Sequence, residues 1–134
     1  MTRDSINVTL PTQDTTKSIE VAAVTKQAVT QANGITIANA LDNKNNSLQI
    51  YVENTTGGTT PATSTTTIKA GDAYPNAILG DLNVALGAGK TTAILLEDIS
   101  RFENKDKSVN IDFASGFTGN IWAVAKRAGI KPTS

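Results

Sequence analysis

The segment SVNIDF, residues 108–113, decides the fold class of this chain because polar and apolar residues alternate along it. A strand turns successive side chains to opposite faces, so the alternation predicts a strand with Val109, Ile111 and Phe113 in the core. Ser108 and the other polar residues of the segment are expected on the solvent face. The segment therefore indicates a sheet with one buried face and one exposed face.

Segments on both sides of residues 108–113 have the same character. Leu82–Leu86 and Thr91–Leu96 are predicted strands joined by a turn that contains glycine, Gly87–Lys90. Ile121–Lys126 is a closing strand with the only tryptophan of the chain. Further strands are expected at Ile6–Leu10, Ile19–Val24, Ile35–Ala38, Leu48–Glu53 with Leu48, Ile50 and Val52 inward, and Thr65–Lys69.

The spacing of these segments predicts an all-β fold. About eight or nine short strands at intervals of roughly ten residues, with almost no helical periodicity, are typical of a sandwich or barrel. We expect a single-domain antiparallel β-sandwich, jelly-roll-like, over residues 31–126. Residues 1–30 are expected to form an extended N-terminal arm and residues 127–134 a loose tail. At 134 residues the chain is long enough for one self-sustaining core.

Composition excludes several classes of function. Twelve basic and twelve acidic residues balance, so no charged field favours nucleic acid or an anionic membrane as a partner. The chain has no cysteine and no histidine. Thiolate nucleophiles, imidazole bases and the commonest metal ligands are therefore absent, and we expect neither an enzyme nor a cofactor.

Two motifs resemble ligand loops and fail on inspection. Gly87–Thr92 looks like the end of a phosphate-binding loop, but the first glycine of that motif would fall at Val84, inside a predicted strand. Asp42–Glu53 has acids at the outer positions of a calcium loop, but Lys44 occupies a ligand position and Ser47 replaces the required glycine. A hairpin turn and a solvated loop, respectively, are the expected structures.

Acidic and aromatic residues do not assemble into a convincing site. A glycosidase pair would have to come from the scattered carboxylates Glu97, Asp98, Glu103, Asp106 and Asp112. Sheet proteins commonly have such acids on their wet faces. The larger aromatic residues are expected in the core or at its edge: Phe102, Phe113, Phe117 and Trp122.

The N-terminal residues Met1–Ser5 lack the apolar run of a secretory signal, and no stretch reaches the roughly 20 apolar residues of a spanning helix. We expect a protein that is made and used in a cytosol, or carried out of it inside something larger. The segment Asn54–Pro61 contains two glycines and no apolar anchor, which predicts an exposed loop.

A string of short segments between Leu48 and Val124 resembles small structural proteins from the head gene clusters of tailed bacteriophages. These segments are Thr67–Asp72, Leu79–Leu82, Leu96–Glu97, Ser100–Phe102, Ser108–Phe113 and Gly119. The resemblance implies a capsid decoration or cement protein, a β-sandwich that binds the outside of the major capsid protein lattice. It also implies a homotrimer, located on the virion exterior after assembly in the host bacterial cytoplasm.

The residues of the N-terminal arm suggest how such a protein could attach. We expect Ile6, Val8 and Leu10 to pair with a neighbouring subunit or with the shell by strand addition. Related alternatives are a head-fibre base and a tail structural protein. A carbohydrate-binding module is a further alternative, disfavoured because Tyr51, Tyr74 and Trp122 are few and scattered along the sequence.

Overall fold

The computed structural model describes residues 3–9, 12–14, 19–21, 24–38, 45–71, 80–96, 102 and 104–127. For 12–14, 19–21, 45–47 and 125–127 only the main chain is described. No α-helix occurs in these ranges, and the all-β class predicted from the alternating segments is confirmed.

Most of the strands lie where the sequence alternates or is rich in β-branched residues. They are β1 (Asp4–Thr9), β2 (Thr12–Asp14), β3 (Ile19–Val21), β4 (Gln27–Ala28), β5 (Ile35–Ala38), β6 (Asn45–Asn54), β7 (Ser64–Ile68), β8 (Leu82–Leu86), β9 (Thr91–Leu96), β10 (Val109–Phe113) and β11 (Gly119–Arg127).

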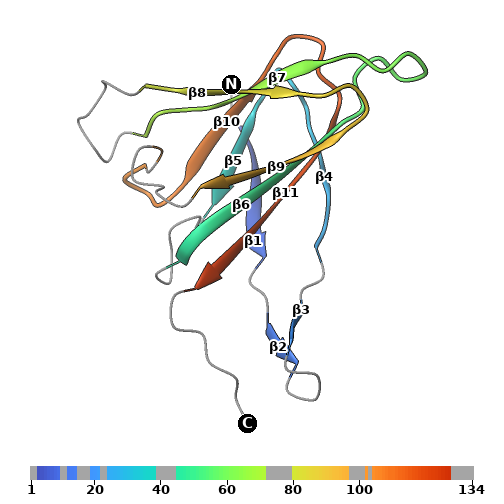
Figure 1. Cartoon of the computed structure of the whole chain (residues 1–134). Helices are drawn as coiled ribbons and strands as arrows, with labels where there is room; N and C mark the ends of the chain where they lie inside the picture. Colours follow the sequence, from blue (N-terminus) through green and yellow to red (C-terminus); the bar gives the residue numbers. More distant parts are fainter. Residues whose placement is uncertain are drawn as a thin grey trace.

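The strands form one large curled sheet and one small sheet. The large sheet has nine strands in the order β8-β7-β10-β5-β1-β11-β6-β9, and β4 pairs with β11 beside this path. It curls until it is nearly barrel-shaped, with β8 and β9 as its two ends (Figure 1). The pair β2–β3 forms a separate hairpin that projects from the body near the end of β1 (Figure 1).

Strand β1 makes this sheet mixed and corrects the expectation of an antiparallel, jelly-roll-like sandwich. Asp4–Asn7 pair in parallel with β5, and Val8–Thr9 pair in parallel with β11. The strand thus leaves one half of the sheet and joins the other. Alternation along a strand shows which side chains point inward but not which distant strand lies beside it, so the sequence could not reveal these parallel pairs.

The same strand accounts for the residues that were expected on a free arm. Ile6 is 8% exposed and belongs to the core, and Val8 packs against that core. Leu10 lies outside the described residues. In the isolated chain these two side chains are used internally, so a role in partner binding, which stays a prediction, would require β1 to leave its own sheet. Within residues 1–30, the described strands β1 and β4 both pair in the large sheet.

The core fills the inside of the curled sheet. The residues predicted to point inward are buried, namely Leu48, Ile50, Val52, Val109, Ile111 and Phe113. Phe113 stacks on Phe117, with ring centroids 4.7 Å apart. Ser108 is the exception to the predicted solvent face: it is buried, because its main-chain N–H and hydroxyl both donate to Asp106 in the preceding turn.

The turn Gly87–Lys90 connects the two ends of the curled sheet. The N–H of Lys90 donates to the carbonyl of Gly87 at 3.2 Å, which confirms the predicted turn. The flanking strands do not pair with each other as a hairpin would: β8 pairs with β7, and β9 pairs with β6. A strand follows the turn where a phosphate-binding loop needs the N-terminus of a helix, so the nucleotide interpretation fails.

Two glycines permit close approaches between strands. Gly34 has φ of +71°, and a Cβ there would lie 2.9 Å from the carbonyl oxygen of Ile111. A Cβ at Gly119 would overlap the carbonyl of Glu53 on β6. Only glycine allows the start of β5 and the start of β11 to reach these positions without displacing their neighbours.

Candidate interaction surface

The hydrogen-bonding phase of β9 shows which of its main-chain groups remain free. The N–H of Asn54 donates to the carbonyl of Lys90 at 3.0 Å, in the same register as the β6–β9 ladder. In an antiparallel ladder hydrogen-bonded pairs alternate with non-hydrogen-bonded pairs. The groups of Thr92, Ile94 and Leu96 therefore face β6. Those of the residues between them, Thr91, Ala93 and Leu95, point away from the sheet.

The edge formed by β8 follows the same logic but is shorter. Lys69 and Thr65 of the β7 region bond to β10, through Lys69 N–H to Asn110 O and Ala114 N–H to Thr65 O. The residues of β7 that alternate with these have main-chain groups that point to the other side, and they bond to β8. This leaves only Asn83 and Ala85 with main-chain groups directed away from β7.

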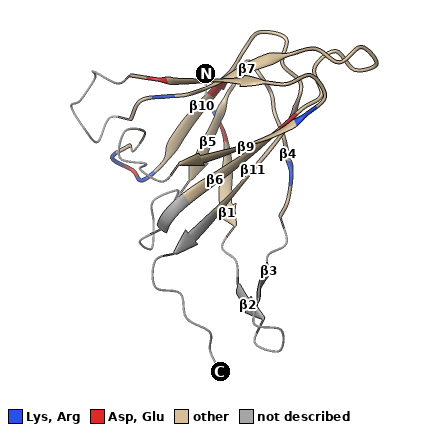
Figure 2. Cartoon of the chain, viewed as in Figure 1, with Lys and Arg blue, Asp and Glu red and all other residues tan. Residues whose placement is uncertain are grey.

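Neither edge strand contains a charged residue or a proline. The sequences are LNVAL for β8 and TTAILL for β9. Figure 2 shows both strands without charge along their length. Charges and prolines are the usual means of preventing an exposed edge from pairing with another chain. Among the described strands, β8 and β9 thus end the large sheet without this protection.

The outer face beside β9 is largely apolar and aromatic. Leu95 is 60% exposed, the highest value among the large hydrophobic residues described. Ala93 lies opposite Tyr51 on β6, and Tyr51 lies opposite Trp122 on β11. The register therefore places one exposed alanine and two half-buried aromatic rings in a row across three strands.

The aromatic pair corrects the view that the aromatic residues are scattered. Tyr51 and Trp122 stack with ring centroids 5.5 Å apart and planes inclined by 8°. Lys26 Nζ lies 5.3 Å from the Trp122 ring centroid, on the β4 side of β11. Trp122 thus lies between Tyr51 and Lys26, and both of its faces are occupied. Sugar stacking on Trp122 would require Lys26 to move, which disfavours a carbohydrate platform.

Glu53 anchors the polar end of this face. Its carboxylate accepts hydrogen bonds from Asn120 Nδ2 at 2.7 Å and from Lys26 Nζ at 3.1 Å. The bond from Asn120, followed by the bond from Lys26, holds the pKa of Glu53 below its ordinary value of 4.5. The three side chains link β6, β11 and the segment before β4.

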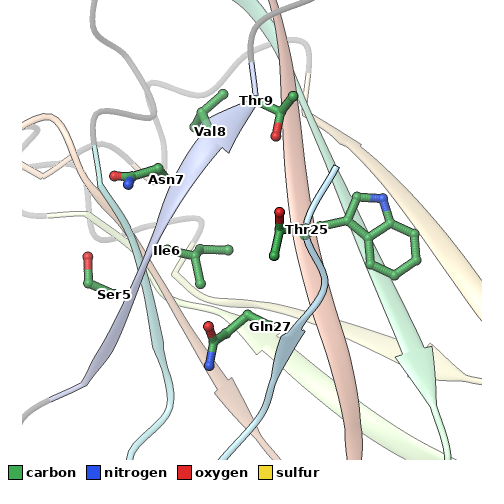
Figure 3. A pocket seen from close by; sticks show the side chains of 8 residues that line it. Ser5, Ile6, Asn7, Val8, Thr9, Thr25 and Gln27 are labelled. Carbon is green, nitrogen blue, oxygen red and sulfur yellow. The ribbon is translucent and has the colours of Figure 1, made fainter. Parts of the chain in front are cut away.

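A cavity of about 300 Å³ opens between β1 and the segment Thr25–Gln27. It is lined by Ser5, Ile6, Asn7, Val8, Thr9, Thr25, Gln27 and Trp122. Figure 3 shows Thr25 and Gln27 on one side of the cavity and the side chains of β1 on the other. The lining contains hydroxyl and amide groups but no charged side chain. This cavity can therefore accept an uncharged hydrogen-bonding group and offers nothing to hold an ion.

A second cavity, of about 280 Å³, lies among the loops at the Gly57–Gly58 turn. Its polar wall includes Asn54, which is 1% exposed and fully bonded: Nδ2 donates to Ala62 O at 2.9 Å and Gly87 O at 3.0 Å. Oδ1 accepts from Thr56 N at 3.0 Å. Asn54 therefore ties the end of β6 to two loops, the β6–β7 connection and the turn after β8, and this structural role explains its burial. The predicted exposure of Gly57 and Gly58 is confirmed.

Of the acidic residues considered as a catalytic pair, the structure describes two, and each of these bonds to a different partner. Asp112 forms an ion pair with Arg3, and Asp106 bonds to Ser108, which lowers the pKa of Asp106. Glu97, Asp98 and Glu103 lie outside the described residues. Within the described ranges, no three acidic residues gather in a way that could hold a metal ion. No helix in those ranges is long and apolar enough to cross a membrane.

Sequence reasoning missed two contributors to the surface. In the run Ala93-Ile94-Leu95-Leu96 every residue is apolar, so period two could not show that Leu95 points outward. Lys26 lies in the part of the chain that was expected to form an extended arm, and nothing local indicates its contact with Trp122. No family model, curated protein or solved structure matches the chain.

Proposed function

We propose that this chain is a virion structural protein that binds the outside of a bacteriophage capsid and reinforces the major capsid protein lattice. The observation that carries the proposal is the pair of open, uncharged sheet edges at β8 and β9. Proteins that remain alone in solution usually protect such edges. Open edges are expected in a subunit whose sheet is continued by strands of neighbouring subunits. The resemblance to small head proteins of tailed phages suggests that the assembly is a phage capsid.

The surface chemistry supports binding by shape and main-chain hydrogen bonds. The edges offer free N–H and C=O groups at Asn83, Ala85, Thr91, Ala93 and Leu95, together with the exposed Leu95 side chain. Strand addition uses such groups and needs no charge. The proposal assigns the chain no catalytic step and no cofactor, and it includes self-association of the chain on the shell.

The test is co-sedimentation with purified phage shells that lack this protein. We expect saturable binding that changes little between low and high salt, because no charged residue lies on the edges. Bound shells should rupture at a higher temperature than bare shells, since a ligand that binds only the intact state at 100 times its Kd adds about 2.7 kcal/mol per site.

Two variants make this test specific to the edges. Combining Ala85→Lys with Leu95→Lys places a charge on each edge and should abolish co-sedimentation. Val24→Lys is the matched control, because Val24 is the other exposed large hydrophobic residue among those described, at 42%. Absence of binding by the unmodified protein would contradict the proposal, as would equal binding by the double variant.

A further inference from the structure

The free edge of β9 is complementary to itself. Its outward main-chain groups belong to Thr91, Ala93 and Leu95, which are spaced two residues apart around Ala93. A second β9 laid antiparallel and centred on Ala93 places Thr91 opposite Leu95 of the other copy, and Ala93 opposite Ala93. Each of these positions is then a hydrogen-bonded pair, in which N–H donors and C=O acceptors are exchanged.

We propose that two copies of this chain associate through β9, antiparallel, about a twofold axis at Ala93. The large sheet then continues from β6 and β9 of one copy into β9 and β6 of the other. This is an isologous contact, in which the same patch serves both partners. The inference concerns the isolated protein and does not rest on the proposed binding to a capsid.

The side chains along the edge favour a second copy as the occupant. Thr91, Ala93 and Leu95 are uncharged and exposed, so the pairing brings no like charges together. The charged residue just before the strand, Lys90, comes opposite Leu96 of the other copy. Glu53, opposite Thr91 on β6, is already bonded to Asn120 and Lys26. Leu95, 60% exposed in the single chain, lies against Thr91 of the second copy and loses contact with water.

The edge of β8 is a weaker candidate for the same contact. It offers outward main-chain groups at only two residues, Asn83 and Ala85. The side chain of Asn83 is also occupied, because its Oδ1 accepts a hydrogen bond from Thr67 Oγ1 at 2.8 Å. The longer edge, with the exposed leucine, is therefore the one assigned to pairing.

A single introduced cysteine tests the axis directly, because the chain has no cysteine of its own. Hydrogen-bonded antiparallel pairs have Cα atoms about 5.5 Å apart, within the roughly 4.4–6.8 Å spanned by disulfides. In a glutathione redox buffer, Ala93→Cys should form a disulfide-linked dimer at least about tenfold faster than Ala28→Cys. Ala28 is an exposed alanine on β4, away from this edge. Equal rates for the two variants would overturn the inference.

Sedimentation of the unmodified protein supplies the second measurement. We expect a monomer–dimer equilibrium, with the Kd raised at least about tenfold by Leu95→Lys and unchanged by Val24→Lys. A monomer at all concentrations would overturn the inference, as would a closed trimer without rapid linking of Ala93→Cys. Neither result bears on shell binding. Conversely, a dimer that links rapidly but fails to bind shells would sustain the inference and remove the proposed function.

Discussion

The β6–β11 pair at the centre of this fold has two flanks, and they are completed in different ways. Beyond β11, β4 and β1 share one edge, and the hydrogen bonds of Glu53 with Lys26 and Asn120 cross that side. Beyond β6, the flank is β9 alone, uncharged and with free main-chain groups. One flank is therefore tied to the rest of the chain on both sides, while the other ends in free main-chain groups, which is the flank that we propose for pairing.

Removing β1 should break the first flank and have the largest effect. Deletion of residues 1–9 takes the partner from one side of β5 and from part of β11, and it empties the site of Ile6. Loss of one buried isoleucine side chain alone typically costs about 2–5 kcal/mol. The whole deletion then approaches the total stability of a domain, about 5–15 kcal/mol. We expect no cooperative urea unfolding by circular dichroism.

A synthetic peptide of residues 1–9 provides the control for this deletion. Added in trans, it should restore cooperative unfolding in a dose-dependent way if β1 is an interior strand. A truncated protein whose midpoint equals that of the full chain would show instead that residues 1–9 are dispensable for folding, as expected of a free arm.

Two proline substitutions in β9 test which of its main-chain N–H groups face β6. We expect their effect on stability to be smaller than that of the deletion. The N–H of Thr92 faces β6, so Thr92→Pro should leave an acceptor on β6 unsatisfied and cost about 1–3 kcal/mol in urea unfolding. The N–H of Ala93 faces outward, and proline is tolerated at such edge positions. Ala93→Pro should cost less than about 1 kcal/mol yet abolish pairing through β9. A larger cost at Ala93 than at Thr92 would mean that the phase is reversed.

The smallest expected effect concerns pH and the charged side of the molecule. The pKa of Glu53 is lowered in the folded chain. The contribution of this carboxylate to folding stability is therefore present above the ordinary pKa of 4.5 and is lost as the pH falls through the lower pKa of the folded state. Glu53→Gln should therefore reduce the drop in thermal midpoint between about pH 6 and about pH 3. The change should be small, since exposed ion pairs contribute little.

Lys26→Gln is the companion variant for this pH measurement, and it should reduce the same drop by less than Glu53→Gln does. Asn120, the larger cause of the lowered pKa, is still present in that variant. Identical midpoints for Glu53→Gln and the unmodified protein at both pH values would exclude a contribution from this carboxylate.

The sequence predicted individual strands better than their arrangement. The alternation around Ile111 and Ile50 correctly identified both strands and their buried residues, because period two is a local property. The partner strands of β1 could not be predicted, because Asp4 lies opposite Ile35 on β5 while Val8 lies opposite Ala123 on β11. No local pattern encodes contacts that join such distant parts of a chain.

The candidate surface was predictable only in part, for the same reason. The uncharged character of Leu82–Leu86 and Thr91–Leu96 is plain in the sequence, but their position at the ends of the sheet is not. Tyr51 and Trp122 appear scattered until the β6–β11 register places them opposite each other. Ser108 was assigned to solvent because alternation takes no account of the turn at Asp106 that buries it.

The double pairing of β1 also has a consequence for biosynthesis. Its first residues bind β5, which follows soon after it in the chain, whereas its last residues wait for β11, which is made much later than β5. Topologies that join distant segments fold slowly and expose unpaired strands meanwhile. Newly made copies should therefore pass through a stage in which one half of the sheet lacks its neighbour, and they are most exposed to wrong partners before β11 has been made.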